Sequence, residues 1–312
     1  MPLISAREVT KRYPTVTALD AFTVDLEPGI IGFVGANGAG KSTFIRILLG
    51  LLPPTSGRAT VLGFDAQEQP LELRKWVGYM PEHDCLPLDV SGTEFVTHMG
   101  RMSGLRPSAA RERAAEMLRH VGLHEERYRL IGSYSTGMKQ RIKLAQALAH
   151  DPKLLLLDEP TNGLDPEGRD EMLGLVERTG RDFGIAVLVT SHLLGEIERV
   201  CDTLVAIDAG KLRYCGSVAA LTEQTQRLRL EVDEDAERMA ERLRARGLTV
   251  TAQGVELMVG FHDDSVFDVV RDTAAELGAP LARVELQRHR LEDLFRATSD
   301  APALAAQGAA HD

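Results

Sequence analysis

The chain has 312 residues, of which 44% are hydrophobic and 26% charged, and its net charge is −10 at pH 7. The length predicts about two domains, and the acidic balance argues against non-specific nucleic-acid binding, which needs a basic surface. The three cysteines show no metal-ligand spacing and fit a reducing cytoplasm. The first residues do not fit the pattern expected of a signal peptide, and no apolar run approaches the ~18–20 residues needed to span a bilayer. We therefore expect a soluble chain, for which any membrane role requires another subunit.

Residues 3–34 predict β-strands, and Tyr13 stands at the end of one of them. Tyr13 could stack on a purine, although for this residue alone an aromatic plug at a sheet edge is the better interpretation. The apolar run 30–34 predicts a short buried strand, and residues 43–49 predict a helix.

Between this strand and helix, residues 35–42 read Gly-Ala-Asn-Gly-Ala-Gly-Lys-Ser and fit the pattern G-x-x-x-x-G-K-[ST] in full. In this context the backbone N–H groups of the loop and the positive end of the helix bind phosphate. Lys41 would reach the β- and γ-phosphates, Ser42 a Mg²⁺ ion and Thr43 the α-phosphate. A chance glycine-rich turn is disfavoured by the flanking strand and helix. The predicted nucleotide contacts are Gly35, Asn37, Gly38, Ala39, Gly40, Lys41, Ser42 and Thr43.

Residues 61–64 and 76–80 predict two further strands, and the second runs into Glu82. Residues 91–149 then predict helices, one of which begins near Ser135. A glycine-containing turn at a helix start is an anion site by its geometry. An ordinary N-cap at Ser135 is the simpler local alternative.

Four leucines at 154–157 predict a strand buried on both faces, as in a parallel sheet. Asp158 and Glu159 follow at its carboxyl end, where open α/β sheets bind ligands. Asp158 could hold Mg²⁺ directly or through water, and Glu159 could take a proton from an attacking water. The alternative, a solvated strand end, is disfavoured because Mg²⁺ at a phosphate loop needs a carboxylate partner.

After a tight turn at 161–165, Pro166 begins another predicted helix, and residues 185–190 predict the next buried strand. That strand runs into His192. Most single histidines are structural or exposed, but one at a strand's carboxyl end beside a phosphate site is placed to hydrogen-bond a γ-phosphate.

The chain beyond residue 223 predicts the order β-α-β-β-α-β, the split arrangement of a ferredoxin-like domain. We expect a nucleotide-binding domain over 1–220, a C-terminal α+β module over 223–298 and a disordered tail over 299–312. A last helix at about 290–297 would dock Leu291, Leu294 and Phe295 onto a nucleotide-binding domain. The module shows no catalytic constellation, so it is interpreted as regulatory or dimer-stabilising, or else as an appendage that only adds stability.

Six motifs stand in one sequence order. They are the phosphate loop, Tyr-Met-Pro-Glu at 79–82, Ser-Thr-Gly-Met-Lys-Gln-Arg at 135–141, Leu-Asp-Glu-Pro-Thr at 157–161, Gly-Leu-Asp at 163–165 and Ser-His at 191–192. Over about residues 3–218 this order resembles the nucleotide-binding subunit of an ATP-binding-cassette (ABC) transporter. The details look most like the export-type ATPases of drug-resistance and polysaccharide-export systems, whose permeases are separate chains, and the ending Leu-Glu-Asp-Leu-Phe at 291–295 is similar to theirs.

The resemblance implies an α/β P-loop NTPase cassette with a RecA-like core and antiparallel β and helical subdomains. It implies ATP and Mg²⁺ as ligands, with Tyr13 stacked on adenine. The metal would be held by Ser42, Glu82 and Asp158, and catalysis would involve Lys41, Glu159 and His192.

The resemblance also implies an ATP-dependent homodimer that closes head to tail, at the cytoplasmic face of the membrane and against a separate permease. Ser135 and Gly137 of one subunit would then cover the γ-phosphate held by the other, and Asp165 would contribute to nucleotide binding. No nucleic-acid partner is implied.

Two of the motifs depart from the family pattern. The family's Leu-Ser-Gly-Gly-Gln is Tyr-Ser-Thr-Gly-Met at 134–138, which keeps Ser135 and Gly137. The coupling-loop glutamine is replaced by Glu82, which can still ligate Mg²⁺ or its water but adds negative charge near the phosphates.

Two other functional classes are disfavoured. A soluble, non-transport cassette ATPase commonly carries two cassettes or a long insert, whereas this chain has one cassette, no heptad run and an acidic balance. A catalytically inactive nucleotide-binding regulator is disfavoured because Lys41, Asp158, Glu159 and His192 are all present.

Overall fold

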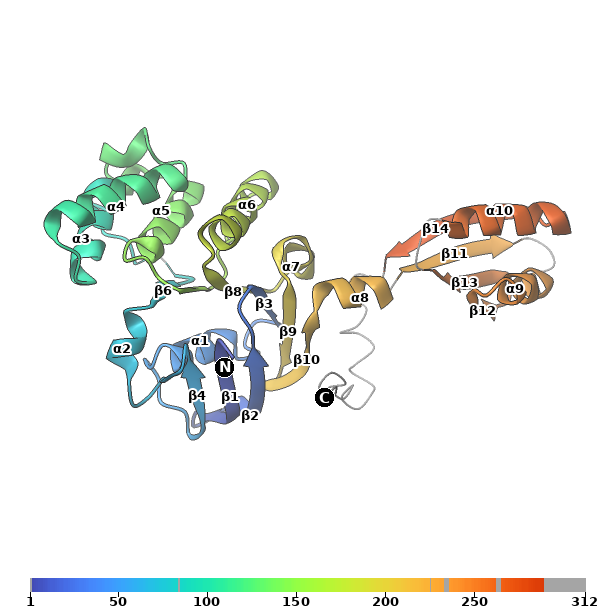
Figure 1. The fold of residues 1–312 in the computed structure, drawn as a ribbon, viewed down its shortest axis with the longest axis horizontal. Helices are drawn as coiled ribbons and strands as arrows, with labels where there is room; N and C mark the ends of the chain where they lie inside the picture. The colour runs from blue at the N-terminus through green and yellow to red at the C-terminus, as the bar shows by residue number, and fades with distance from the viewer. Residues whose placement is uncertain (1, 84, 225, 233–235, 262–264, 289–312) are drawn as a thin grey trace. The chain divides into compact units, whose positions relative to one another are not determined.

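The computed structural model describes residues 2–83, 85–224, 226–232, 236–261 and 265–288. The chain divides into two compact units between Gly216 and Ser217. The first unit combines two β-sheets with helices, and the second is a small α+β unit (Figure 1). The predicted helix at 290–297, its docking residues Leu291, Leu294 and Phe295, and the tail 299–312 lie outside the described residues.

A six-stranded sheet forms the centre of the first unit, with the order β10-β9-β3-β8-β7-β6. The pairs β9–β3, β3–β8, β8–β7 and β7–β6 are parallel, so the carboxyl ends of these strands meet at one edge. All residues of β3, β7 and β8 are buried, as expected for a parallel sheet covered on both faces. The strands are β3 (Ile30–Val34), β6 (Val77–Met80), β7 (Leu154–Leu157), β8 (Ala186–Ser191), β9 (Thr203–Asp208) and β10 (Lys211–Ser217).

A second sheet of the same unit has the order β2-β1-β4-β5. Its strands are β1 (Ile4–Arg12), β2 (Thr17–Leu26), β4 (Ser56–Val61) and β5 (Phe64–Asp65). Helix α1 (Lys41–Leu48) joins the two sheets into one core, because the rings of Phe22, Phe33 and Phe44 contact one another with centroids 4.9–6.0 Å apart.

The predicted strand at 61–64 is wrong. Val61 ends β4 and pairs with Phe64, which begins β5, so Leu62 and Gly63 form the turn between two antiparallel strands. Both turn residues have positive φ, 52° and 81°, which is the conformation of a two-residue hairpin turn. The run of apolar side chains concealed this turn.

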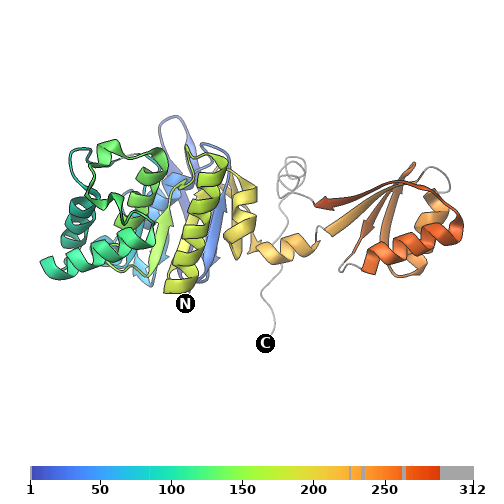
Figure 2. The ribbon, with the colours of Figure 1, turned by 90° about the horizontal axis from the view of Figure 1, so that it is seen from above.

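The predicted helical region between β6 and β7 is confirmed. Helices α3 (Gly92–Met102), α4 (Pro107–His120) and α5 (Thr136–Leu148) pack on one another, and two short 3-10 turns separate α4 from α5. Figures 1 and 2 show these green helices grouped at one end of the first unit. The remaining helices of this unit are α2 (Pro70–Arg74), α6 (Pro166–Phe183) and α7 (Leu194–Val200). Within the described ranges, no helix combines the length and apolarity needed to cross a bilayer.

The second unit begins with α8 (Val218–Gln224) and then follows the predicted order of strands and helices. All pairs of its sheet, β12-β13-β11-β14, are antiparallel, and the unit has a hydrophobic core of its own. This is the ferredoxin-like order. The domain bounds 1–220 and 223–298 remain a prediction, because the second extends past the described residues. The elements are β11 (Gln226–Val232), α9 (Ala236–Ala245), β12 (Thr249–Gln253), β13 (Glu256–Gly260), α10 (Ser265–Leu277) and β14 (Leu281–Arg288).

Candidate functional site

The phosphate-loop pattern lies between β3 and α1, as predicted. Gly40 precedes α1 with φ 113°, and a Cβ atom there would lie 2.4 Å from the carbonyl oxygen of Ala18, so only glycine fits. Gly35 packs against Ile207 and Ala39 is buried, so these two support the loop. The other predicted loop residues line a cavity of about 260 Å³. Its lining is Ala36, Asn37, Gly38, Gly40, Lys41, Ser42, Thr43, Glu82 and Glu159.

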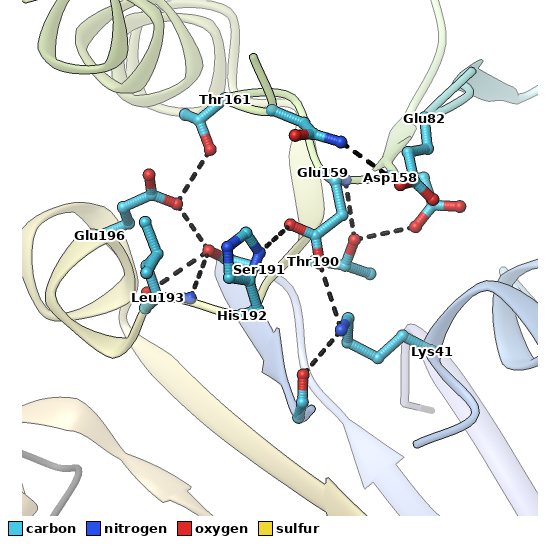
Figure 3. A network of polar contacts seen from close by, with 12 residues as sticks. Lys41, Glu82, Asp158, Glu159, Thr161, Thr190, Ser191, His192, Leu193 and Glu196 are labelled. Atoms are coloured by element: carbon cyan, nitrogen blue, oxygen red, sulfur yellow. Dashed lines mark hydrogen bonds and ion pairs between the residues drawn. The ribbon is translucent and has the colours of Figure 1, made fainter. Parts of the chain in front are cut away.

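Lys41 holds a positive charge within this cavity. Its ammonium donates to the carbonyl oxygens of Gly35, at 2.7 Å, and Ala36, at 3.4 Å. It also lies 3.2 Å from Glu159 Oε1, and the two side chains are only 6% and 7% exposed (Figure 3). Among the described residues, Glu159 Oε1 has no hydrogen-bond partner, so its contact with the Lys41 ammonium is an ion pair. A bound phosphate would compete with Glu159 for the ammonium.

Asp158 lies beside Ser42 at the carboxyl end of β7. Its Oδ1 accepts hydrogen bonds from Ser42 Oγ at 3.2 Å and from Thr190 Oγ1 at 2.9 Å. Burial raises the pKa of Asp158, the two hydroxyls oppose this shift, and the charges of Glu82 and Glu159 reinforce it. Without a bound cation, the ionised form of Asp158 is therefore less favourable in the folded protein than in water.

These oxygens fit a magnesium site. A carboxylate and a hydroxyl 3.2 Å apart are ligands that Mg²⁺ takes, and a cation would offset the repulsion among the three carboxylates. Among the described residues, no group of three His, Cys, Asp or Glu side chains could hold a metal ion by itself. Phosphate and water oxygens would thus complete the coordination, as is usual for Mg²⁺ with nucleotides.

Glu159 is held from several sides. Its backbone has φ 50°, an unfavourable conformation for a residue with a Cβ, and its N–H donates to Thr190 Oγ1 at 2.8 Å. His192 Nδ1 lies 2.9 Å from Glu159 Oε2, while Oε1 faces Lys41 (Figure 3). The carboxylate is thereby fixed at the cavity wall, where it can accept a proton from a water inside.

Glu82 reaches the same cavity from the segment after β6. Its Oε1 accepts from Asn162 Nδ2 at 3.3 Å, and its backbone oxygen accepts from Lys143 Nζ at 3.0 Å. Lys143 is fully buried in α5, so this bond connects α5 to the cavity wall. Thr190 and Lys143 were not predicted as site residues. A lysine inside the apolar stretch of α5 was a signal that could have been followed.

Ser135, Gly137 and Asp165 line a different cavity, of about 650 Å³. Ser135 Oγ caps α5 by accepting from Met138 N at 3.3 Å, and Asp165 Oδ1 caps α6 by accepting from Gly168 N at 2.9 Å. Two helix N-termini therefore meet this cavity, and both attract negative charge.

Tyr13 lies just beyond the end of β1, and its side chain is exposed. The ammonium of Lys11 stands 5.5 Å from the centroid of its ring. The ring is thus accessible at the surface and is not part of the lining of the phosphate-loop cavity.

Comparisons with known proteins identify the family. Residues 19–162 match the family model described as "ABC transporter". The linearmycin resistance ATP-binding protein LnrL of Bacillus subtilis is 33% identical over 302 residues, which cover 94% of this chain and 97% of that protein. The daunorubicin/doxorubicin resistance ATP-binding protein DrrA of Streptomyces peucetius is 37% identical over 253 residues, or 80% and 76% of the two chains. The chain belongs to the ABC transporter family.

The solved structures agree with this assignment of the ABC fold. An ATP-binding subunit of an ABC transporter is 26% identical with a TM-score of 0.62, over 71% of this chain and 92% of that one. A dimeric ATP-binding cassette bound to ADP and Pi has a TM-score of 0.63 at 23% identity, over 69% and 98% of the two chains, which shows a shared fold. This ABC protein is an ATP-binding, ATP-hydrolysing subunit of the export type, as its motif order predicted.

Proposed function

We propose that this ABC subunit hydrolyses Mg·ATP in a head-to-tail homodimer and powers export through a separate membrane permease, at the cytoplasmic face of the membrane. Lys41, Ser42 and Glu159 line one phosphate-loop cavity, and Asp158 accepts a hydrogen bond from Ser42, which supports this role. LnrL and DrrA are named for resistance to linearmycin and to daunorubicin/doxorubicin, which favours an antibiotic-like cargo here too.

Each side chain has a distinct role in this proposal. Ser42 and Asp158 would hold Mg²⁺, with Glu82 as a further oxygen ligand, and the bound ion supplies positive charge for the phosphates. Lys41 binds the β- and γ-phosphates. Because Lys41 contacts Glu159 in the protein alone, its transfer to phosphate frees the Glu159 carboxylate to accept a proton from the attacking water.

His192 steadies Glu159 through Nδ1, and the opposite ring nitrogen, Nε2, is the one that would hydrogen-bond the γ-phosphate. These groups contribute mainly position and charge, which account for most of the catalysis of phosphoryl transfer.

The separation of the two cavities supports the proposed homodimer. Ser135, Gly137 and Asp165 line one cavity, and the phosphate loop lines the other. In a head-to-tail pair, the helix N-termini of one subunit would cover the phosphates held by its partner. The exposed ring of Tyr13 would stack on adenine.

The substitution Glu159→Gln tests the proposal. We expect it to lower turnover by ~10²–10⁴-fold, the usual cost of losing a positioned general base. ATP binding should persist, and the protein should accumulate as an ATP-bound dimer in size-exclusion chromatography. Glu112→Gln is the matched control, since Glu112 is exposed on α4. Hydrolysis by Glu159→Gln at the parental rate would refute the assignment.

The permease is tested separately. The full chain, expressed in cells with its neighbouring genes and solubilised from membranes, should co-purify with a protein that has several membrane spans. Recovery of the ATPase only from the soluble fraction, with no membrane protein bound, would contradict the transport role while leaving the hydrolytic assignment in place.

A further inference from the structure

Glu196 is a buried carboxylate on α7 that does not line the phosphate-loop cavity. Its Oε2 accepts two hydrogen bonds, from Thr161 Oγ1 at 3.0 Å and from Ser191 Oγ at 2.5 Å (Figure 3). The two hydroxyls belong to different segments. Thr161 lies in the turn that follows Glu159, and Ser191 ends β8 directly before His192.

Burying the Glu196 carboxylate in this way lowers the stability of the folded state. The residue is 8% exposed, and its Oε1 is buried without a hydrogen-bond partner among the described residues. Two neutral hydroxyls compensate only part of the cost of burying a carboxylate. The neighbouring inward positions of α7, Leu194, Ile197 and Val200, are apolar, so an apolar side chain would serve stability better here.

The contacts of Ser191 extend from Glu196 to both sides of His192. Ser191 Oγ accepts a hydrogen bond from Leu193 N at 3.0 Å while it donates to Glu196. Ser191 is the last residue of β8, and its hydroxyl links Glu196 to the backbone N–H of Leu193, on the far side of His192. The same carboxylate holds Thr161, so the segments that carry Glu159 and His192 are tied to a single point.

We propose that Glu196 is a positioning residue for ATP hydrolysis. It holds the turn at Thr161 and the loop at Ser191 at a set separation, so that His192 meets Glu159 at 2.9 Å. This inference rests on the proposed function, because the pair that it positions is the hydrolytic pair.

The test compares Glu196→Ala with Glu198→Ala, which changes an exposed glutamate on the same helix. We expect Glu196→Ala to lower kcat roughly 10- to 100-fold, as a misplaced catalytic pair does. ATP affinity, measured by calorimetry, should be unchanged because Glu196 lies outside the phosphate-loop cavity. Glu198→Ala should keep the parental kcat.

A double variant separates positioning from a merely structural role. Because Glu196 acts through His192, the pair Glu196→Ala and His192→Ala together should be no slower than His192→Ala alone. Losses that multiply, or a parental kcat in folded Glu196→Ala, would overturn the inference.

Two further measurements keep the outcomes distinct. If Glu196→Ala does not fold, Thr161→Val and Ser191→Ala each remove one hydroxyl, and parental kcat in both would overturn the inference. Glu159→Gln serves as the reference. If it is inactive while Glu196→Ala is fully active, only this inference fails, whereas an active Glu159→Gln refutes the proposed function itself.

Discussion

Replacing Lys41 by methionine is expected to destabilise the first unit as well as to weaken ATP binding. The Lys41 ammonium lies 3.2 Å from Glu159 Oε1, and both side chains are buried. Removing one partner of such a pair costs ~3–5 kcal/mol, because the other charge remains buried without it. His192 still contacts Glu159 in this variant, so we expect the low end of the range, about 3 kcal/mol.

The double variant Lys41→Met with Glu159→Gln isolates the charge effect. Neither charge then remains buried, so most of the lost stability should return. Glu159→Gln alone should cost less than Lys41→Met, because Lys41 keeps the carbonyl oxygens of Gly35 and Ala36 as acceptors. Lys75→Met is the control, since its partner Glu72 is exposed and such surface pairs contribute about 0–1 kcal/mol.

Urea unfolding followed by tryptophan fluorescence measures this effect in the first unit. Trp76 is the only tryptophan of the chain and lies in that unit, so its signal is not mixed with the unfolding of the second. In calorimetry, ATP affinity of Lys41→Met should fall roughly 10- to 150-fold, which corresponds to about 1.5–3 kcal/mol for a charge-assisted contact. A parental unfolding midpoint for Lys41→Met, or a double variant as unstable as the single one, would refute the reasoning.

Three further predictions concern charge at the site and the second unit. Glu82→Gln should keep or raise ATPase activity, because the amide retains an oxygen ligand and removes the negative charge that repels Asp158. A phosphate-release assay measures this activity, and a loss as deep as that of Glu159→Gln would contradict the prediction. Asp158→Asn should abolish Mg²⁺-dependent hydrolysis yet raise the urea midpoint without nucleotide at neutral pH. Folding raises the pKa of Asp158, so its contribution to stability falls as pH rises above the carboxyl's ordinary range, and the gain from asparagine should shrink toward about pH 4. Truncation after Ser217 should leave ATP binding intact but weaken ATP-dependent dimerisation. If the truncated and full-length proteins dimerise equally well in sedimentation experiments, the second unit does not stabilise the dimer.

Local patterns in the sequence were sufficient to predict the phosphate loop, the two adjacent carboxylates and the order of elements in the second unit. The phosphate loop was predictable because its glycines, its lysine and its flanking strand and helix are all adjacent in the chain. Asp158 and Glu159 were predictable because they follow four buried leucines. The order of elements in the second unit was predictable for the same reason, since each helix and strand carries its own periodicity.

The turn at Leu62 and Gly63 was mispredicted because positive φ at a non-glycine residue leaves no mark in apolar composition. Only the tertiary structure decided which distant side chains meet. Thr190 reaches Asp158 and the backbone of Glu159, Lys143 reaches the segment at Glu82, and Glu196 joins two segments.

The tertiary structure also placed Ser135 and Asp165 on a cavity separate from that of Lys41. The physical reason is the parallel sheet. Its strands are far apart in sequence but end at one edge, so the partners of each carboxylate depend on strand order and not on spacing along the chain.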